Sequence, residues 1–323
     1  MKTVSQVFLF MLLLLVVPVG AFASQMEFYG GLTYNTFDPA EINELLQDLN
    51  EEVIPKEELE SNEEGLPSFI YGIELAGNLD YIKATPKELA EIKRGYGGFL
   101  GGRCWLRPEV AVGSEIEHFR FGSEGGIDGL LEVSELTISQ SGEGGFIHEV
   151  GDLSLDGALD FSVTGGVTGC ALGVALKALP QVAIFGSVGY YYLNGTLEQR
   201  LWADYGGDEE ISASVKVDFA KSSPGYKIGG SFSYPVNKDL SVIGRVSHRS
   251  IVFTEVEETP TAELKGVKKF LMSKADLDEE QAAEQEGELK ASFEKVDSSD
   301  INLPWEEFNL SGYEVALGVA YWF

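Results

Sequence analysis

Basic residues, histidine and cysteine are scarce in this sequence, and each scarcity excludes a class of protein. The 323 residues contain 23 Lys and Arg against 52 Asp and Glu, which gives a formal net charge of −29 at pH 7. Nucleic-acid recognition needs clusters of Lys and Arg, so nucleic acid is not expected as a partner. The three His and two Cys show no metal-ligand spacing, and no metal or cofactor is predicted.

The scarcity of histidine also limits catalysis. One hydrolytic arrangement could combine Ser250, His248 and Glu117, which would make a membrane-embedded lipid-modifying enzyme. Such a triad needs its side chains within hydrogen-bond reach of one another, but alternation along the strands places His118 and His248 on the side that would face lipid. The sequence therefore predicts no catalytic site and a protein that is not an enzyme.

The two cysteines leave two alternatives open. Cys104 and Cys170 lie far apart in the sequence, each in a strand-like stretch. An oxidising compartment would allow a disulfide between them, whereas two buried free thiols are equally compatible with the pattern.

Long hydrophobic runs are absent beyond the amino-terminal segment. Residues 1–23 combine Lys2, an apolar stretch from Val7 to Val19 and the small-x-small motif Ala21-Phe22-Ala23, which predicts a secretory signal peptide cleaved after Ala23. No later run is long enough for a membrane helix. The mature chain, residues 24–323, is therefore either soluble outside the inner membrane or inserted as a β-barrel.

Glycine-rich alternating segments are what the sequence has in abundance. Three of them read as hairpins with tight turns, namely Gly97 to Phe119, Thr168 to Tyr192 and Ile228 to His248,. With single strands at Met26 to Phe37 and Leu310 to Phe323 the total is eight. The prediction is an all-β, antiparallel, up-and-down transmembrane β-barrel, with ten strands as the alternative if Phe69 to Ile82 supplies a pair.

Long segments separate these hairpins, at about 38–94, 123–157, 205–222 and 257–309. Short turns at one end and long loops at the other are typical of bacterial outer-membrane barrels, whose long loops face the outside of the cell. Short helices are predicted in these loops at 38–46 and 86–93 and within the acidic stretch 276–300. The acidic loops lack the ligand spacing of a calcium loop, so any cation binding is expected to be diffuse.

Side-chain alternation divides the strands into an apolar face and a polar face. A membrane barrel turns its bulky apolar face outward, which places a set of charged residues inside the lumen: Arg103, Glu115, Glu117, Arg245, Arg249 and Glu314. Opposite charges can be buried in a narrow tube only if they pair. We therefore expect a plugged lumen, with a gated path of low conductance as the alternative.

Aromatic residues gather near the predicted strand ends, as in the interfacial girdles of membrane barrels. The set comprises Trp105, Tyr190, Tyr191, Tyr192, Trp202, Tyr234, Tyr321 and Trp322.

The last strand carries the resemblance to a known family. One of its faces consists of Tyr313, Val315, Leu317, Val319, Tyr321 and Phe323. Together with the signal peptide and the hairpins, this aromatic ending resembles the small outer-membrane barrels of the OmpA, OmpX and OmpW kind, here without a periplasmic domain after Phe323.

The resemblance implies a location in the outer membrane, contact with its lipid, and a monomer. It also implies that the six residues of that face act as the signal for the barrel-assembly machinery. The expected role is structural or surface-interactive, with a narrow channel for small or apolar solutes as the alternative.

Overall fold

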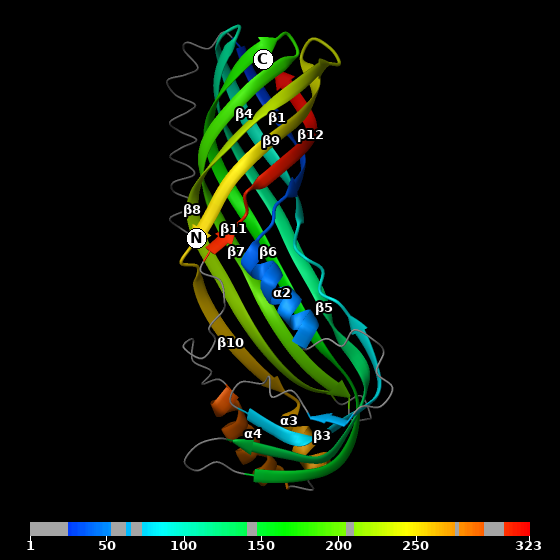
Figure 1. The fold of residues 1–323 in the computed structure, drawn as a ribbon. Helices are drawn as coiled ribbons and strands as arrows, with labels where there is room; N and C mark the ends of the chain where they lie inside the picture. Colours follow the sequence, from blue (N-terminus) through cyan, green and yellow to red (C-terminus); the bar gives the residue numbers. More distant parts are fainter. Residues whose placement is uncertain are drawn as a thin grey trace.

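Eight antiparallel strands close into a ring. The computed structural model describes residues 25–52, 63–65, 73–140, 147–204, 210–274, 278–293 and 307–323, so the predicted signal peptide lies outside the described residues. The strands of the ring are β1 (Gln25–Thr36), β4 (Arg94–Arg107), β5 (Val110–Gln140), β6 (Ile147–Leu179), β7 (Val182–Asp204), β8 (Glu210–Pro235), β9 (Leu240–Thr254) and β12 (Gly312–Trp322). The predicted all-β antiparallel barrel with eight strands is confirmed (Figure 1).

The first and last strands of the ring, β1 and β12, pair with each other. Their register runs from Glu27 opposite Trp322 to Asn35 opposite Glu314. Phe323 completes the seam because its backbone N–H donates to the carbonyl of Met26 at 2.9 Å. The ring therefore has no unpaired edge along this seam.

Four strands of the ring are much longer than predicted. The segments 123–157 and 205–222 were expected to be loops, but β5 pairs with β6, and β7 with β8, through most of both. Residues 122–129 are rich in Gly, Ser, Glu and Asp, a composition that resembles a loop. Strands that continue beyond the apolar part of the wall can carry such residues on their outer face, because that face meets water.

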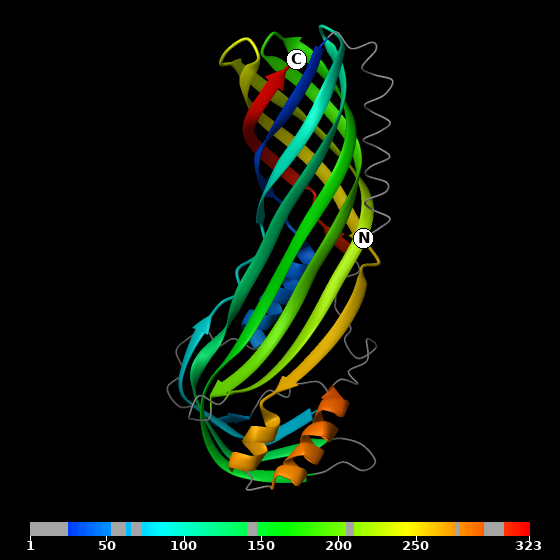
Figure 2. The ribbon, with the colours of Figure 1, turned by 180° about the vertical axis from the view of Figure 1, so that it is seen from behind.

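Beyond Thr36 of β1 and Gly312 of β12, the ring opens into a curved sheet, which forms the lower half of the molecule in Figure 2. This sheet consists of the long strands β5 to β8, with β10 (Glu257–Lys265) paired to β8 and β3 (Ile73–Lys87) paired to β5. The short strand β2 (Glu63–Gly65) pairs with β3, and β11 (Glu307–Asn309) pairs with β9. The strand predicted as a loop hairpin or strand extension at 69–82 is thus largely β3, outside the ring.

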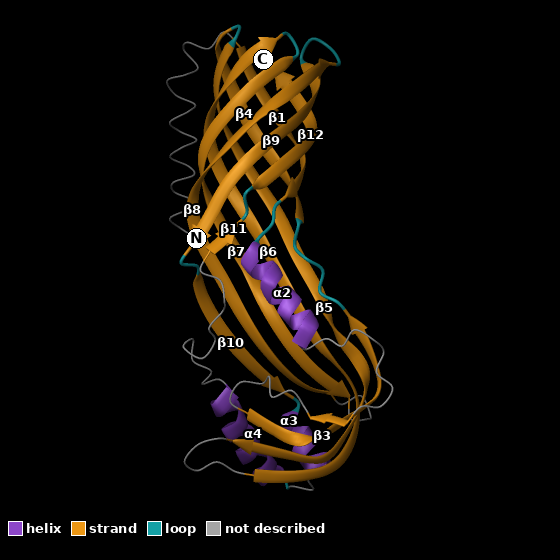
Figure 3. Ribbon diagram, viewed as in Figure 1, coloured by secondary structure: helices purple, strands orange, loops and turns teal. Residues whose placement is uncertain are grey.

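Helix α2 (Ala40–Glu52) lies beside the long strands, at the level where the ring has opened into the curved sheet (Figure 3). Helices α3 (Val267–Lys274) and α4 (Glu279–Phe293) lie at the far end of the curved sheet. The predicted helices at 38–46 and within 276–300 thus have counterparts. Within the described residues, no helix is long and apolar enough to cross a membrane.

The helix predicted at 86–93 is wrong, because residues 86–87 end β3 and residues 88–93 form no helix and bond to α2 through their backbone. Asn43 accepts from the N–H of Ile92 at 2.7 Å and donates to the Ile92 carbonyl at 3.3 Å. Asn50, two helical turns later, makes the same pair of bonds to Leu89, at 2.8 and 2.9 Å. A helix would engage these backbone groups internally, so the two Asn side chains favour the extended form.

Lumen-facing glycines make room for aromatic rings inside the narrow ring of strands. A Cβ atom on Gly169 would overlap the ring of Tyr191, and one on Gly165 would overlap the ring of Phe121. The abundance of glycine in these strands therefore reflects small residues placed opposite large ones, as in other small barrels.

Candidate functional site

Three carboxylates and three cations meet inside the ring of strands. Glu115 and Glu117 come from β5 and Glu314 from β12, while Lys227 comes from β8 and Arg245 and Arg249 from β9. All six side chains are buried, with at most 9% of each residue exposed. The formal charges sum to zero, which is the condition under which charged groups can be buried in a protein interior. We call these six residues the lumen cluster.

Lys227 is the centre of the lumen cluster. Its Nζ lies 2.8 Å from Glu115 Oε1 and 3.2 Å from Glu314 Oε2, and it also donates to Glu117 Oε2. An ammonium group has three N–H donors, and here each of them has a carboxylate partner.

Each arginine of the lumen cluster holds a carboxylate on one side and an aromatic ring on another. Arg245 makes a two-pronged contact with Glu115, at 2.5 and 3.0 Å, and its Cζ lies 4.5 Å from the ring centre of Phe99. Arg249 reaches Glu117 at 3.4 Å, and its Cζ lies 4.0 Å from the ring centre of Phe119. Guanidinium groups suit such sites because they pair with carboxylates in their plane and stack on rings by their faces.

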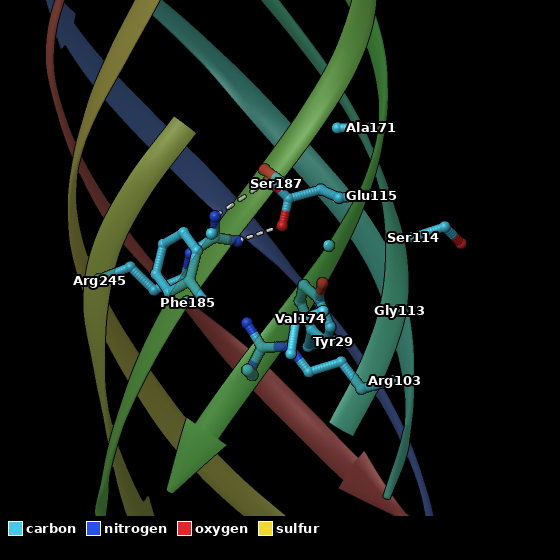
Figure 4. Close-up of a pocket in the computed structure, with 13 residues that line it drawn as sticks. Tyr29, Arg103, Gly113, Ser114, Glu115, Ala171, Val174, Phe185, Ser187 and Arg245 are labelled. Carbon is cyan, nitrogen blue, oxygen red and sulfur yellow. Dashed lines mark hydrogen bonds and ion pairs between the residues drawn. The ribbon is translucent and has the colours of Figure 1, made fainter. Parts of the chain in front are cut away.

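The structure brings together five of the six residues predicted for the lumen, and it places the sixth on the same side of the wall. Arg103 forms no ion pair with the described carboxylates; its guanidinium stacks on Tyr29, with Cζ 4.5 Å from the ring centre. Figure 4 shows Arg103 beside Tyr29, and Arg245 joined to Glu115.

The central residue Lys227 was missed by sequence reasoning. A signal for it exists, because Lys227 stands between Tyr226 and Ile228, whose side chains are both exposed on the outer wall. Strict alternation therefore places Lys227 inside.

Three predicted girdle residues, Trp105, Tyr191 and Trp322, have side chains on the lumen side of the wall and not on its outer face. Trp105 is buried and its Nε1 donates to Glu27 Oε2 at 3.0 Å, while its ring stacks on Trp322 with centres 6.0 Å apart. Tyr191 is fully buried, whereas its neighbours Tyr190 and Tyr192 are exposed. Alternation along their strands turns Trp105 and Tyr191 toward the lumen. Their position near a strand end does not change that direction.

Two small cavities lie between the lumen cluster and the turn end of the barrel, in the described part of the chain. One of about 30 Å³ is lined by Tyr29, Arg103, Glu115 and Arg245 among others. A second of about 40 Å³ lies nearer the turns, against Glu27, Trp105, Lys177 and Trp322 among others. Each has room for about one or two water molecules, so neither is a continuous pore.

A hydrophobic core fills the barrel on the other side of the lumen cluster. Two of its members, Ile42 and Leu46, come from α2, and both are buried. The aromatic members are Phe37, Phe119, Phe121, Phe161, Tyr191, Phe219, Phe253 and Phe308. The lumen is thus closed twice, first by paired charges and then by apolar packing against a helix.

The residues of the alternative catalytic triad do not meet. Glu117 belongs to the lumen cluster, whereas His248 lies on the outer wall with its ring 5.2 Å from that of Tyr313. Ser250 shares the outward parity of His248 and contacts Ser311 at 3.5 Å. The barrel wall therefore separates the carboxylate from the other two groups.

The structure also answers the questions about cysteine and metal for its described part. Cys104 and Cys170 are both free and half-buried, so the disulfide alternative is not realised. Among the described residues, no group of three or more His, Cys, Asp or Glu side chains is arranged to hold a metal ion.

Comparison with solved structures finds outer-membrane proteins. The chain is similar to the outer membrane protein OprG from Pseudomonas aeruginosa, with 10% identity over 93% of this chain and 96% of that chain and a TM-score of 0.35. It is also similar to CarO from Acinetobacter baumannii, with 14% identity over 74% of this chain and 96% of that chain and a TM-score of 0.26. No family model and no curated protein matches the sequence.

Replacing Lys227 by Met should destabilise the barrel strongly. The change leaves three buried carboxylates facing two arginines, and breaking a buried ion pair in this way costs about 3–5 kcal/mol. Urea-unfolding midpoints of the refolded protein measure the effect, and Lys238→Met, at an exposed turn position, is the matched control. The double variant Lys227→Met with Glu117→Gln restores the charge balance and should recover part of the loss. Equal midpoints for the two single variants would contradict the central role of Lys227.

Proposed function

We propose that this chain is an outer-membrane β-barrel with a closed lumen and a structural or surface-interaction role. The observation that carries the proposal is the outer wall, where large apolar side chains face outward around the ring. Leu32, Leu100, Val188 and Leu317 are each between 64 and 75% exposed. Membrane barrels have apolar residues outside and polar residues inside, whereas soluble barrels have the opposite arrangement. The arrangement here is that of a membrane barrel.

Two groups of outward aromatic residues support the same proposal. Tyr34, Tyr96, Tyr190, Tyr226 and Tyr313 are exposed near the level where the ring opens, and Tyr234, Tyr321 and Phe323 are exposed near the turns. Aromatic side chains of this kind are enriched where a bilayer meets water. We assign the turn end to the periplasm and the curved sheet to the outside of the cell, as in other barrels with short turns at one end.

The closed lumen favours a structural or surface role over transport. A channel needs a continuous polar path. In this barrel, the ion pairs of the lumen cluster and the hydrophobic core block the lumen one after the other. The lipid-modifying alternative loses its support because the wall separates Glu117 from His248. The curved sheet beyond the ring is the part of the molecule that would meet other surfaces.

Membrane insertion can be tested with an arginine on the lipid-facing wall. Leu317→Arg places a charge in the apolar band, which costs about 2–4 kcal/mol near the middle of a bilayer. We expect much less folded protein in phospholipid vesicles, measured by the shift in gel mobility between unboiled and boiled samples. Thr261→Arg, at an exposed site on β10 outside the ring, should insert like the wild type. If both variants insert equally well, the outer wall does not face lipid and the proposal fails.

The terminal strand is included in the proposal as the signal for the barrel-assembly machinery. Its outward face runs from Tyr313 to Phe323, and Phe323 is 70% exposed, packing edge-on against Phe28 with ring centres 5.5 Å apart. An exposed terminal ring adds little to the core and remains available to a partner during assembly.

Deleting Phe323 should therefore reduce assembly in cells more than it reduces stability. We expect less heat-shiftable barrel in outer-membrane fractions, while barrel refolded in vitro keeps nearly the wild-type unfolding midpoint. Phe323→Trp, which keeps an aromatic end, is the control and should assemble normally. Normal assembly of the truncated chain would refute the signal role.

A further inference from the structure

A polar group interrupts the apolar outer wall at the level of the outer tyrosine girdle. His118 and Arg120 lie on β5, Thr168 lies directly opposite His118 on β6, and Tyr96 lies directly opposite Arg120 on β4. Thr168 in turn pairs with Tyr192 of β7. The group is thus flanked on both sides by exposed tyrosines.

Hydrogen bonds fix the arrangement of this group. His118 Nδ1 lies 3.0 Å from Thr168 Oγ1, and Arg120 Nε donates to His118 Nε2 at 3.3 Å. In the tautomer whose Nε2 accepts from Arg120, the ring proton lies on Nδ1, where it can be donated to Thr168,. His118 therefore orients the guanidinium of Arg120 without neutralising its charge.

The two outward arginines, Arg120 and Arg94, are not paired with carboxylates in the described part of the chain. Arg94 is the outward residue two positions before Tyr96, and Asp38 and Glu91 line the same surface hollow as Arg94 without an ion pair to it. By contrast, cations farther out on the wall are paired, as in Arg200 with Glu210 at 2.8 Å and Lys216 with Asp218 at 3.0 Å. In a chain of net charge −29, two unneutralised guanidinium groups side by side indicate an anion from elsewhere.

The distance between the two arginines suits a single anionic group. Arg120 pairs with Tyr96, and Arg94 lies one outward position farther along the same strand. Diagonal neighbours of this kind are about 7–8 Å apart at their backbones, so both long side chains can reach one phosphate between them. Arginine is well suited to this ligand because its planar fork matches phosphate oxygens.

We propose that Arg94, Arg120 and Thr168, with His118 as a positioning residue, bind the phosphorylated headgroup of a lipid in the outer leaflet. The ligand is a lipid rather than a free anion because the same face continues into the exposed apolar residues Tyr96 and Leu100. An acyl chain along that band would bring its headgroup to the level of the arginines. This inference rests on the proposed membrane insertion and adds a specific ligand class to it.

Binding of lipid A and of its dephosphorylated form to the purified barrel in detergent tests the site. Native mass spectrometry should show the phosphorylated form binding at least about tenfold more tightly, as charge-assisted hydrogen bonds to phosphate would give. The double variant Arg94→Gln with Arg120→Gln should lose most of that preference. The control is Arg107→Gln with Arg200→Gln, which removes the same charge away from the site and should keep the preference.

Two outcomes would overturn the site. One is an unchanged preference in the Arg94 and Arg120 double variant, and the other is displacement of lipid A by an equal concentration of inorganic phosphate, which would mean that free anion is recognised. Insertion into phospholipid vesicles is measured on the same preparations. If the wild-type protein inserts but shows no preference for phosphorylated lipid A, only the proposed lipid site is contradicted. If it does not insert, the proposed function is contradicted as well.

Discussion

The contact of Lys227 with three carboxylates is the interaction on which the rest of the structure depends. The ring of eight strands is narrow, and the alternation that turns Leu317 and its neighbours outward also turns Glu314 inward. An outer wall suited to lipid therefore imposes a polar interior. That interior is stable only if its charges cancel, and Lys227 with Arg245 and Arg249 cancels Glu115, Glu117 and Glu314.

The aromatic and apolar layers complete this closure. Phe99 and Phe119 lie against the guanidinium groups and exclude water from their faces. Beyond them, α2 packs Ile42 and Leu46 into the barrel, and Asn43 and Asn50 fasten the helix to the chain that enters β4. The helix thus belongs to the plug and does not form a detached surface loop.

Much of this architecture could be predicted from side-chain alternation. The three predicted hairpins and the inward direction of five members of the lumen cluster follow from one period of two. Lys227 follows from the same rule, since Tyr226 and Ile228 flank it. The lengths of β5 to β8 could not be predicted, because the part of these strands beyond the apolar outer wall loses the apolar half of the alternating pattern. The contacts of His118 and Arg120 were also beyond prediction, since they depend on the register between β4, β5 and β6.

Electrical recording from planar bilayers tests the central claim of a closed lumen most directly. Purified wild-type barrel, shown to be inserted by its resistance to extraction from the bilayer, should give no conductance steps over a range of voltages. The paired charges and the hydrophobic core block ions in series, and the two small cavities on the turn side of the lumen cluster hold about one or two water molecules each,. Reproducible steps from the wild-type protein would contradict the account, because they would require a continuous aqueous path past Lys227.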